Sequence, residues 1–185
     1  IIKQVLFAVK EVHEAGFLHL DIQDGNVFIK GSLSEEDNLV SLVDFGAARP
    51  VCEDGLCPVI RDRALFSTMG FESPEIVGRN DGTQRLGAES DLYSVGYLLL
   101  LMLTGKRYTQ RELDSANIGL YLSKRKLKKL NCPAHMADKV HQIISKALKK
   151  TPEERYHSCE EMLADVSDLI HALQPYKSDL SQVVY

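Results

Sequence analysis

The chain has 185 residues, of which 44% are hydrophobic, and its 22 Lys and Arg against 26 Asp and Glu give a formal net charge of −4. This length predicts one domain with a sizeable core, and the mildly acidic balance excludes a surface that is basic throughout, so no nucleic-acid partner is expected. The four cysteines contain no C-x-x-C pair, and the sequence shows neither a signal peptide nor an apolar run long enough to span a bilayer, which indicates a cytoplasmic protein without a membrane segment.

An amphipathic helix is predicted at the start of the chain. Its apolar residues, spaced three or four apart, include Ile2, Leu6, Val9 and Val12. The pattern ends at Ala15-Gly16, a favourable C-terminal stop. Because the first residue already lies in this pattern and is not Met, we expect a fragment of a longer protein.

A β-hairpin is predicted next. Val27-Phe28-Ile29 is a short β-like run, residues 30–38 are polar, and Leu39 to Val43 has the composition of a returning strand. From Asp44 to Ile60 the sequence contains Gly, Pro and Cys without periodicity, which predicts a long loop. Loops of this length inside a compact domain are usually functional.

The second half of the chain is predicted to be helical. The expected helices cover residues 90–104, 109–113 and 138–150, and a last one begins at Ser158 with Glu161 at the capping-box position. The first of these is apolar nearly all round, which is typical of a helix buried in the middle of a domain. The predicted fold class is therefore α+β, mostly helical with one small hairpin.

Three polar side chains near the hairpin suggest phosphoryl transfer. Asp21 and Asn26 are separated by four residues before the first strand, and Asp44 follows the second strand. One carboxylate can orient a substrate hydroxyl and accept its proton, whereas a second carboxylate and an amide oxygen suit Mg²⁺. Two short strands that end side by side would bring the three groups together, in a layout where positioning and charge neutralisation supply most of the catalysis.

The motifs around these residues resemble those of protein kinases. The segment from His19 to Asn26, H-L-D-I-Q-D-G-N, resembles the catalytic loop H-R-D-L-x-x-x-N, and Asp44-Phe45-Gly46 matches D-F-G. Ser73-Pro74-Glu75 stands in the place of A-P-E, the segment from Ser90 to Gly96 resembles the start of the central kinase helix, and Arg155 matches the Arg that pairs with the Glu of A-P-E. The catalytic loop lacks the A-A-R pattern of tyrosine kinases, so the chain is identified as a member of the eukaryotic-like protein kinase family of Ser/Thr type.

This resemblance implies a protein-kinase-like fold and a role for each matched residue. Asp21 would be the catalytic base facing a hydroxyl of a protein substrate, and Gln23 stands where Ser/Thr kinases usually carry a Lys beside the transferred phosphate. Asn26 and Asp44 would hold Mg²⁺ and contribute to the ATP site, with Phe28 beneath the adenine. The implied activity is transfer of the ATP γ-phosphate to a protein hydroxyl.

Other matched residues are implied to support the site. Asp91 would brace the catalytic loop from below, and Thr68 would shape the floor of the peptide site. His19 and Phe45 would belong to a stacked apolar column. Glu75 and Arg155 would form a structural ion pair.

The sequence also departs from the family pattern. The Arg of the catalytic loop is replaced by Leu20, which puts switching by loop phosphorylation in doubt, and Gln23 brings no positive charge, which predicts a lower rate. No G-x-G-x-x-G loop or V-A-I-K strand occurs. Residues 1–185 therefore resemble the C-terminal lobe alone. Without the missing N-terminal lobe, this fragment is expected to be inactive.

Two alternative functions remain open. A pseudokinase or interaction module is favoured by Leu20, Gln23 and the missing lobe, but opposed by the intact Asp21, Asn26 and Asp44. A small-molecule phosphotransferase of the aminoglycoside or choline kinase type shares an H-x-D-x-x-x-x-N loop, but it lacks a peptide-binding segment such as the one from residue 68 to residue 75.

The remaining cysteines and histidines give weaker signals. Cys52 and Cys57 lie in the predicted loop without further metal ligands at suitable spacing, so free and partly exposed thiols are expected. Five histidines fall singly on helical segments and are predicted to lie at the surface or at helix caps, namely His13, His135, His141, His157 and His171.

Overall fold

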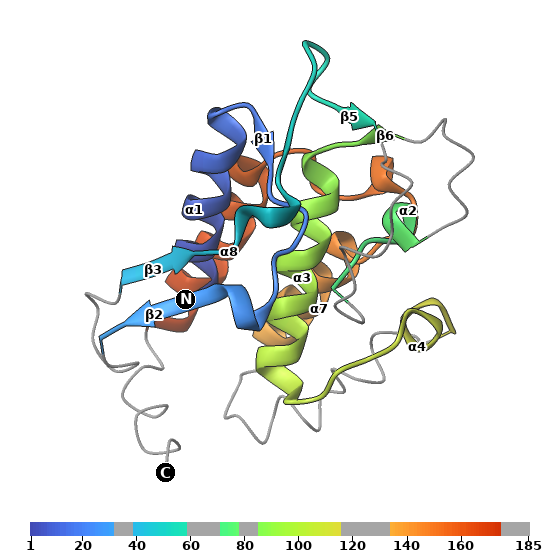
Figure 1. Ribbon diagram of the computed structural model, residues 1–185. Helices are drawn as coiled ribbons and strands as arrows, with labels where there is room; N and C mark the ends of the chain where they lie inside the picture. The colour runs from blue at the N-terminus through green and yellow to red at the C-terminus, as the bar shows by residue number, and fades with distance from the viewer. Residues whose placement is uncertain (32–38, 59–70, 78–84, 116–133, 175–185) are drawn as a thin grey trace.

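A computed structural model describes residues 1–31, 39–58, 71–77, 85–115 and 134–174 (Figure 1). Within these ranges the chain is mostly helical and contains three two-stranded antiparallel sheets, which confirms the predicted mixture of helices with little sheet. No helix in these ranges combines the length and the hydropathy needed to cross a bilayer.

The first half of the chain carries most of the short strands. Its elements are α1 (Ile2–Glu14), β1 (Phe17–Leu18), the 3₁₀ turn η1 (Asp24–Asn26), β2 (Val27–Lys30), β3 (Leu39–Leu42), η2 (Phe45–Ala47), β4 (Arg49–Pro50) and β5 (Cys57–Pro58). The second half consists of α2 (Pro74–Val77), β6 (Arg85–Leu86), α3 (Ala88–Thr104), α4 (Gln110–Ser115), α7 (Ala134–Ala147), η4 (Pro152–Glu154) and α8 (Cys159–Leu173).

The predicted hairpin is confirmed, whereas the loop predicted after it contains further structure. β2 pairs with β3 in antiparallel register, with Val27 opposite Leu42 and Lys30 opposite Leu39. In the described part of the predicted loop, β4 pairs with β1, and β5 pairs with β6. These strands are two residues long, so they are too short to produce the alternating pattern by which a strand is recognised.

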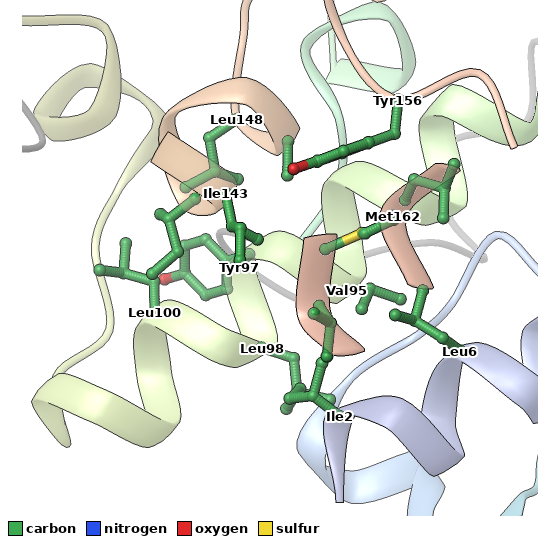
Figure 2. Packing of buried hydrophobic residues seen from close by; sticks show 14 of the residues in the cluster. Ile2, Leu6, Val95, Tyr97, Leu98, Leu100, Ile143, Leu148, Tyr156 and Met162 are labelled. Carbon is green, nitrogen blue, oxygen red and sulfur yellow. The ribbon is translucent and has the colours of Figure 1, made fainter. Parts of the chain in front are cut away.

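The core forms around α3, which lies in the middle of the helices α1, α7 and α8 (Figure 1). Figure 2 shows its side chains packed against those of the neighbouring helices; the labelled residues include Ile2 and Leu6 of α1, Val95, Leu98 and Leu100 of α3, Ile143 of α7 and Met162 of α8. Ten of the 17 residues of α3 are buried, including every position from Ser90 to Leu98, so the helix is covered on all sides over much of its length, which explains its apolar composition. The expectation of a central buried helix is confirmed.

Helix ends follow the expected chemistry with two differences. Gly105 closes α3 at φ +62°, a left-handed conformation that favours glycine, and the Ser158 hydroxyl accepts a hydrogen bond from the Glu161 backbone N–H at 3.2 Å. The Glu161 carboxylate accepts from the His157 N–H at 2.8 Å, one residue before the usual capping-box partner. Helix α7 begins four residues before the predicted start at Asp138 and ends before the predicted end at Lys150.

A buried ion pair joins the two halves of the chain. Both guanidinium Nη atoms of Arg155 donate to the Glu75 carboxylate at 2.7 Å, and Arg155 is only 1% exposed. The Ser90 hydroxyl adds a hydrogen bond to Glu75 at 2.8 Å. Burial by itself would raise the pKa of Glu75, but the hydrogen bonds and charge of Arg155 outweigh it and hold the pKa below its ordinary value. The implied Glu75–Arg155 pair is therefore confirmed.

Close packing of α3 on α7 predicts that Gly96→Ala destabilises the fold. A Cβ at Gly96 would lie 2.4 Å from the Cβ of Ala147, so the two helices would have to separate. Overpacking of this kind costs about 1–3 kcal/mol, which urea denaturation followed by circular dichroism measures. Met102→Ala on the exposed side of the same helix is the control. Equal unfolding midpoints for both variants would contradict the close contact.

The ion pair predicts a stability loss that depends on pH. At neutral pH, Glu75→Gln should reduce the free energy of unfolding by about 3–5 kcal/mol because Arg155 is left buried without its counter-charge. Since the pKa of Glu75 is lowered by folding, its stabilisation is present above the ordinary pKa of about 4.3 and is lost as the pH falls through the lower folded value.

The difference between Glu75→Gln and wild type should therefore shrink on acidification, as measured by urea unfolding over a pH series. Glu154→Gln, which removes an exposed carboxylate 4.0 Å from Lys149, serves as the matched control and should stay close to wild type. A Glu75→Gln difference that stays constant down to low pH would be inconsistent with the ion pair.

Candidate functional site

The loop that carries Asp21 is held by a buried carboxylate of α3. Asp91 is fully buried, and its Oδ2 and Oδ1 accept hydrogen bonds from the backbone N–H groups of His19 and Leu20, both at 2.8 Å. Two backbone donors that would otherwise be buried without a partner are thereby satisfied. The position of the loop is fixed relative to the core helix, as the resemblance implied for Asp91.

His13 is a third partner of this carboxylate. Its Nε2 lies 2.8 Å from Asp91 Oδ2, and its Nδ1 lies 3.6 Å from the Cys159 sulfur, which joins α1, α3 and α8. The prediction of a surface or capping role is wrong for His13, because its side chain is only 16% exposed and contacts the buried Asp91. The two residues are 78 positions apart, so no local pattern in the sequence reports the contact. Burial raises the pKa of the Cys159 thiol to about 12, so the thiol stays protonated in this cluster.

Leu20 anchors the loop on its other side by apolar contact. It adopts a left-handed conformation with φ +62°, and its side chain lies in a small buried cluster with Leu18, Ala47, Cys57 and Leu86. In this cluster the loop meets the β5–β6 pair. Where the family resemblance places an Arg, this chain therefore has a hydrophobic contact that requires no phosphate.

The two loop cysteines differ from each other. Cys52 is exposed as a free thiol, as expected, but Cys57 is 1% exposed, so the prediction of a partly exposed thiol is wrong for it. Pairing of β5 with β6 turns Cys57 into the apolar cluster, and burial raises the pKa of its thiol. Cys57 thus packs as a small hydrophobic residue.

Two side-chain amides hold the carboxylate of Asp21. The Gln23 Nε2 donates to both of its oxygens, at 2.9 and 3.0 Å. The Asn26 Nδ2 donates to Asp21 Oδ2 at 2.8 Å and to the Asp21 backbone carbonyl at 2.9 Å. The carboxylate is therefore fixed in orientation by neutral donors, and Gln23 serves it as a clamp.

The hairpin brings Asp44 to Asn26. The Val43 N–H donates to the Asn26 carbonyl at 3.0 Å, which extends the β2–β3 ladder by one bond and leaves Asp44 as the next residue. Asp44 is exposed at φ +62°, and one carboxylate oxygen accepts from the Gly46 N–H at 3.2 Å. The sequence prediction that the strand ends gather Asp21, Asn26 and Asp44 in one region thus agrees with the backbone.

The oxygen atoms left over here fit a hard cation. Among the described residues, Asn26 Oδ1 and Asp44 Oδ2 accept no hydrogen bond, and both belong to the ligand type that Mg²⁺ prefers. In the part of the chain that the structure describes, no three His, Cys, Asp or Glu side chains form a metal-binding group by themselves. A cation here would need further oxygen ligands from a phosphorylated substrate or water.

The aromatic residues of the site lie at its open side. Phe28 on β2 is 61% exposed, and Phe45 is 51% exposed with its ring centroid 4.8 Å from that of His19. The His19–Phe45 contact agrees with the implied column. The Nε2 of His19 is buried and has no hydrogen-bond partner within the described ranges. Thr68 lies outside the described residues.

An apolar groove of about 870 Å³ lies beside this site, between α1 and β3. Its lining includes the exposed aromatic residues Phe7, Phe17 and Phe45 and the exposed Leu39. Contiguous exposed hydrophobic side chains of this size are rare on a free monomer surface and usually mark a contact with another protein segment.

Comparison with known proteins identifies the family of this chain. A family model for the protein kinase domain matches residues 1–166. The chain belongs to the protein kinase domain family. This membership confirms the kinase resemblance and agrees with the mostly helical fold.

Several similar proteins are serine/threonine-protein kinases by name. The chain is 29% identical over 155 residues to serine/threonine-protein kinase PLK4 of Nematostella vectensis, covering 84% of this chain and 14% of that protein. It is 28% identical over 166 residues to serine/threonine-protein kinase PknB of Mycolicibacterium smegmatis, covering 90% of this chain and 25% of that protein. Against AtPK1/AtPK6 of Arabidopsis thaliana the identity is 32% over 155 residues, covering 84% and 29%. The chain thus spans between 14% and 29% of the length of these three kinases.

The Asp91 contacts predict that Asp91→Asn destabilises the loop that carries Asp21. Asn has one side-chain oxygen where Asp has two, so at least one of the two backbone N–H groups would face an amide donor. An unsatisfied buried N–H costs about 1–3 kcal/mol, to be measured as a lower unfolding midpoint in urea and as faster amide hydrogen exchange at His19 and Leu20. The exposed Asp168→Asn on α8 provides the control. Unchanged exchange at His19 and Leu20 would refute the anchoring role.

Proposed function

We propose that residues 1–185 are the C-terminal lobe of a Ser/Thr protein kinase domain, which transfers the γ-phosphate of ATP to a hydroxyl of a protein substrate. The observation that carries this proposal is the hydrogen-bonded carboxylate of Asp21 beside Asn26, with Asp44 delivered by the hairpin. Family membership and the names of the similar proteins support it.

Asp21 would serve as the catalytic base. Its carboxylate is fixed by Gln23 and Asn26, so the proton-accepting lone pairs keep one direction, and a hydroxyl within about 2.6–3.2 Å could be oriented and deprotonated. Gln23 is a catalytic-loop residue that donates without adding charge. It therefore orients Asp21, but it stabilises a transferred phosphoryl group less than a Lys would.

Asn26 and Asp44 would hold Mg²⁺ through their available oxygens, and Mg²⁺ supplies neutralisation of the charge on the transferred phosphate. The exposed ring of Phe28 on the neighbouring strand would then form one face of the adenine site of ATP. The exposed position of Asp44 suits a residue that binds a ligand from the open side of the domain.

The apolar groove between α1 and β3 is assigned to the N-terminal lobe of the kinase domain. Phe7, Phe17 and Leu39 would be covered by that lobe, which would close over the site from the side on which Phe28 and Phe45 are exposed. Without this cover, ATP would be held by few contacts. The isolated chain should therefore bind ATP poorly and transfer little phosphate, and a cytoplasmic location belongs to the same proposal.

A pseudokinase remains the second candidate, and Gln23 is the observation that favours it. In this interpretation the side-chain amides of Gln23 and Asn26 would only satisfy the hydrogen-bonding needs of the Asp21 carboxylate. The helical surface would bind other proteins. A small-molecule phosphotransferase is less well supported, because Glu75 in the A-P-E-like segment is tied to Arg155 as a stable structural element.

The proposal predicts that Asp21→Asn abolishes most of the phosphotransfer by the full-length protein. Loss of a general base typically lowers the rate by about 10²–10⁴-fold. Incorporation of labelled phosphate from Mg²⁺-ATP into the protein itself and into a generic protein substrate is the measurement. Asp44→Asn should show a comparable loss, together with weaker Mg²⁺ dependence.

The control for both variants is Asp168→Asn, which removes a carboxylate at an exposed position of α8 far along the chain. A folded wild-type protein with no incorporation into either acceptor would favour the pseudokinase. Incorporation that persists unchanged in Asp21→Asn would show that another residue, or a contaminating kinase, is responsible.

A further inference from the structure

An exposed Arg lies at the edge of the catalytic loop and takes no part in the proposed chemistry. The Arg107 side chain follows α3 and donates from one Nη atom to both carboxylate oxygens of Asp24, at 2.7 and 2.8 Å. Arg107 and Asp24 are 50% and 45% exposed. Because Asp24 is three residues after Asp21, this pair lies on the surface that surrounds the base.

The distance between the pair and the base is limited by the chain itself. Three peptide units separate Asp21 from Asp24, so their Cα atoms are at most about 11 Å apart. An extended acceptor segment advances about 3.3 Å per residue. A side chain within about four residues of the acceptor hydroxyl can therefore reach Arg107 while that hydroxyl contacts Asp21.

The Arg107 guanidinium also contacts an aromatic ring, and the residue that follows it is fixed by hydrogen bonds. Its carbon lies 5.4 Å from the ring centroid of Phe71, which packs edge-on against Tyr97 at 4.6 Å. The Tyr97 hydroxyl donates to the Tyr108 carbonyl at 2.7 Å and accepts from the Tyr108 N–H at 2.6 Å, so the residue next to Arg107 is fixed at both backbone groups. A preorganised side chain loses little conformational freedom on binding.

The hydrogen-bonding capacity that this pair still offers to a ligand lies on the guanidinium of Arg107. Both Asp24 oxygens already accept from Arg107, whereas the guanidinium Nε and its second Nη donate to no residue that the structure describes. An Arg fork with unused donors matches the planar geometry of a carboxylate. Lys106, the neighbouring cation, pairs with Glu112 and lies over the Tyr108 ring, so it faces away from this role.

From these contacts we infer that Arg107 selects protein substrates that carry an acidic side chain within about four residues of the acceptor hydroxyl. This inference rests on the proposed kinase function and names its substrate class. Asp24 acts as an internal competitor, because its carboxylate occupies the same guanidinium until an acidic substrate residue shares or replaces it. Acidic substrates are thereby favoured, and basic ones find no free carboxylate at this position.

The test uses the full-length protein and serine peptides in which a single Glu is moved through four positions on either side of the acceptor, each compared with its Gln counterpart. At one or more positions, Glu should improve kcat/KM by about three- to fivefold over Gln, mainly through KM, which is the range of an exposed ion pair. Arg107→Ala should bring the Glu/Gln ratio to one. Asp24→Asn should raise the ratio, because the competing charge is removed.

Lys149→Ala, which removes an equally exposed cation two residues after the end of α7, should leave the ratio as in wild type. A ratio that is the same in wild type, Arg107→Ala and Asp24→Asn, although peptides are phosphorylated, would overturn the inference and leave the kinase function standing. The same holds if both variants slow all peptides by one factor, which is the signature of a purely structural pair. No phosphorylation of any peptide or of the protein itself, with the protein folded, would overturn both proposals.

Discussion

The buried carboxylate of Asp91 is the interaction on which the rest of the site depends. It lies on the helix that forms the centre of the core, and it accepts hydrogen bonds from two consecutive backbone N–H groups of the loop that carries Asp21. Because α3 packs against α1, α7 and α8, the hydrogen bonds of Asp91 anchor the loop to the core. His13 fixes the carboxylate in turn, so a polar network replaces what would otherwise be unsatisfied backbone groups in the interior.

Two further connections position the loop on either side of this anchor. Leu20 enters the apolar cluster with Cys57 and Leu86, which ties the loop to the β5–β6 pair, and Asn26 begins the hairpin that returns the chain at Asp44. Both connections are independent of any added charge. They are consistent with a site whose residues are positioned by folding alone, in contrast to one that requires a phosphate opposite an Arg.

Long periodic elements and the motif residues were predictable from the sequence, but contacts between distant positions were not. The amphipathic pattern of α1 and the apolar α3 predict their helices, and the strand β2 follows from its β-branched and aromatic residues. The two-residue strands β1, β4, β5 and β6 contain too few residues for a pattern, so the burial of Cys57 could not be foreseen. His13 and Asp91 are 78 positions apart, and Asp24 and Arg107 are 83 apart, and neither pair has a local signal.

In the proposed kinase, Asp91 would act on phosphotransfer by positioning Asp21. A double-mutant cycle of Asp91→Asn and Asp21→Asn in the full-length protein tests it most directly, with phosphate incorporation from Mg²⁺-ATP as the readout and folding checked by circular dichroism. If the claim is correct, Asp91→Asn lowers the rate in the wild-type background but has little further effect once Asp21 is Asn, because residues that act as a unit are strongly non-additive. Rate reductions that multiply in the double variant would contradict it and show that Asp91 acts on the reaction independently of Asp21.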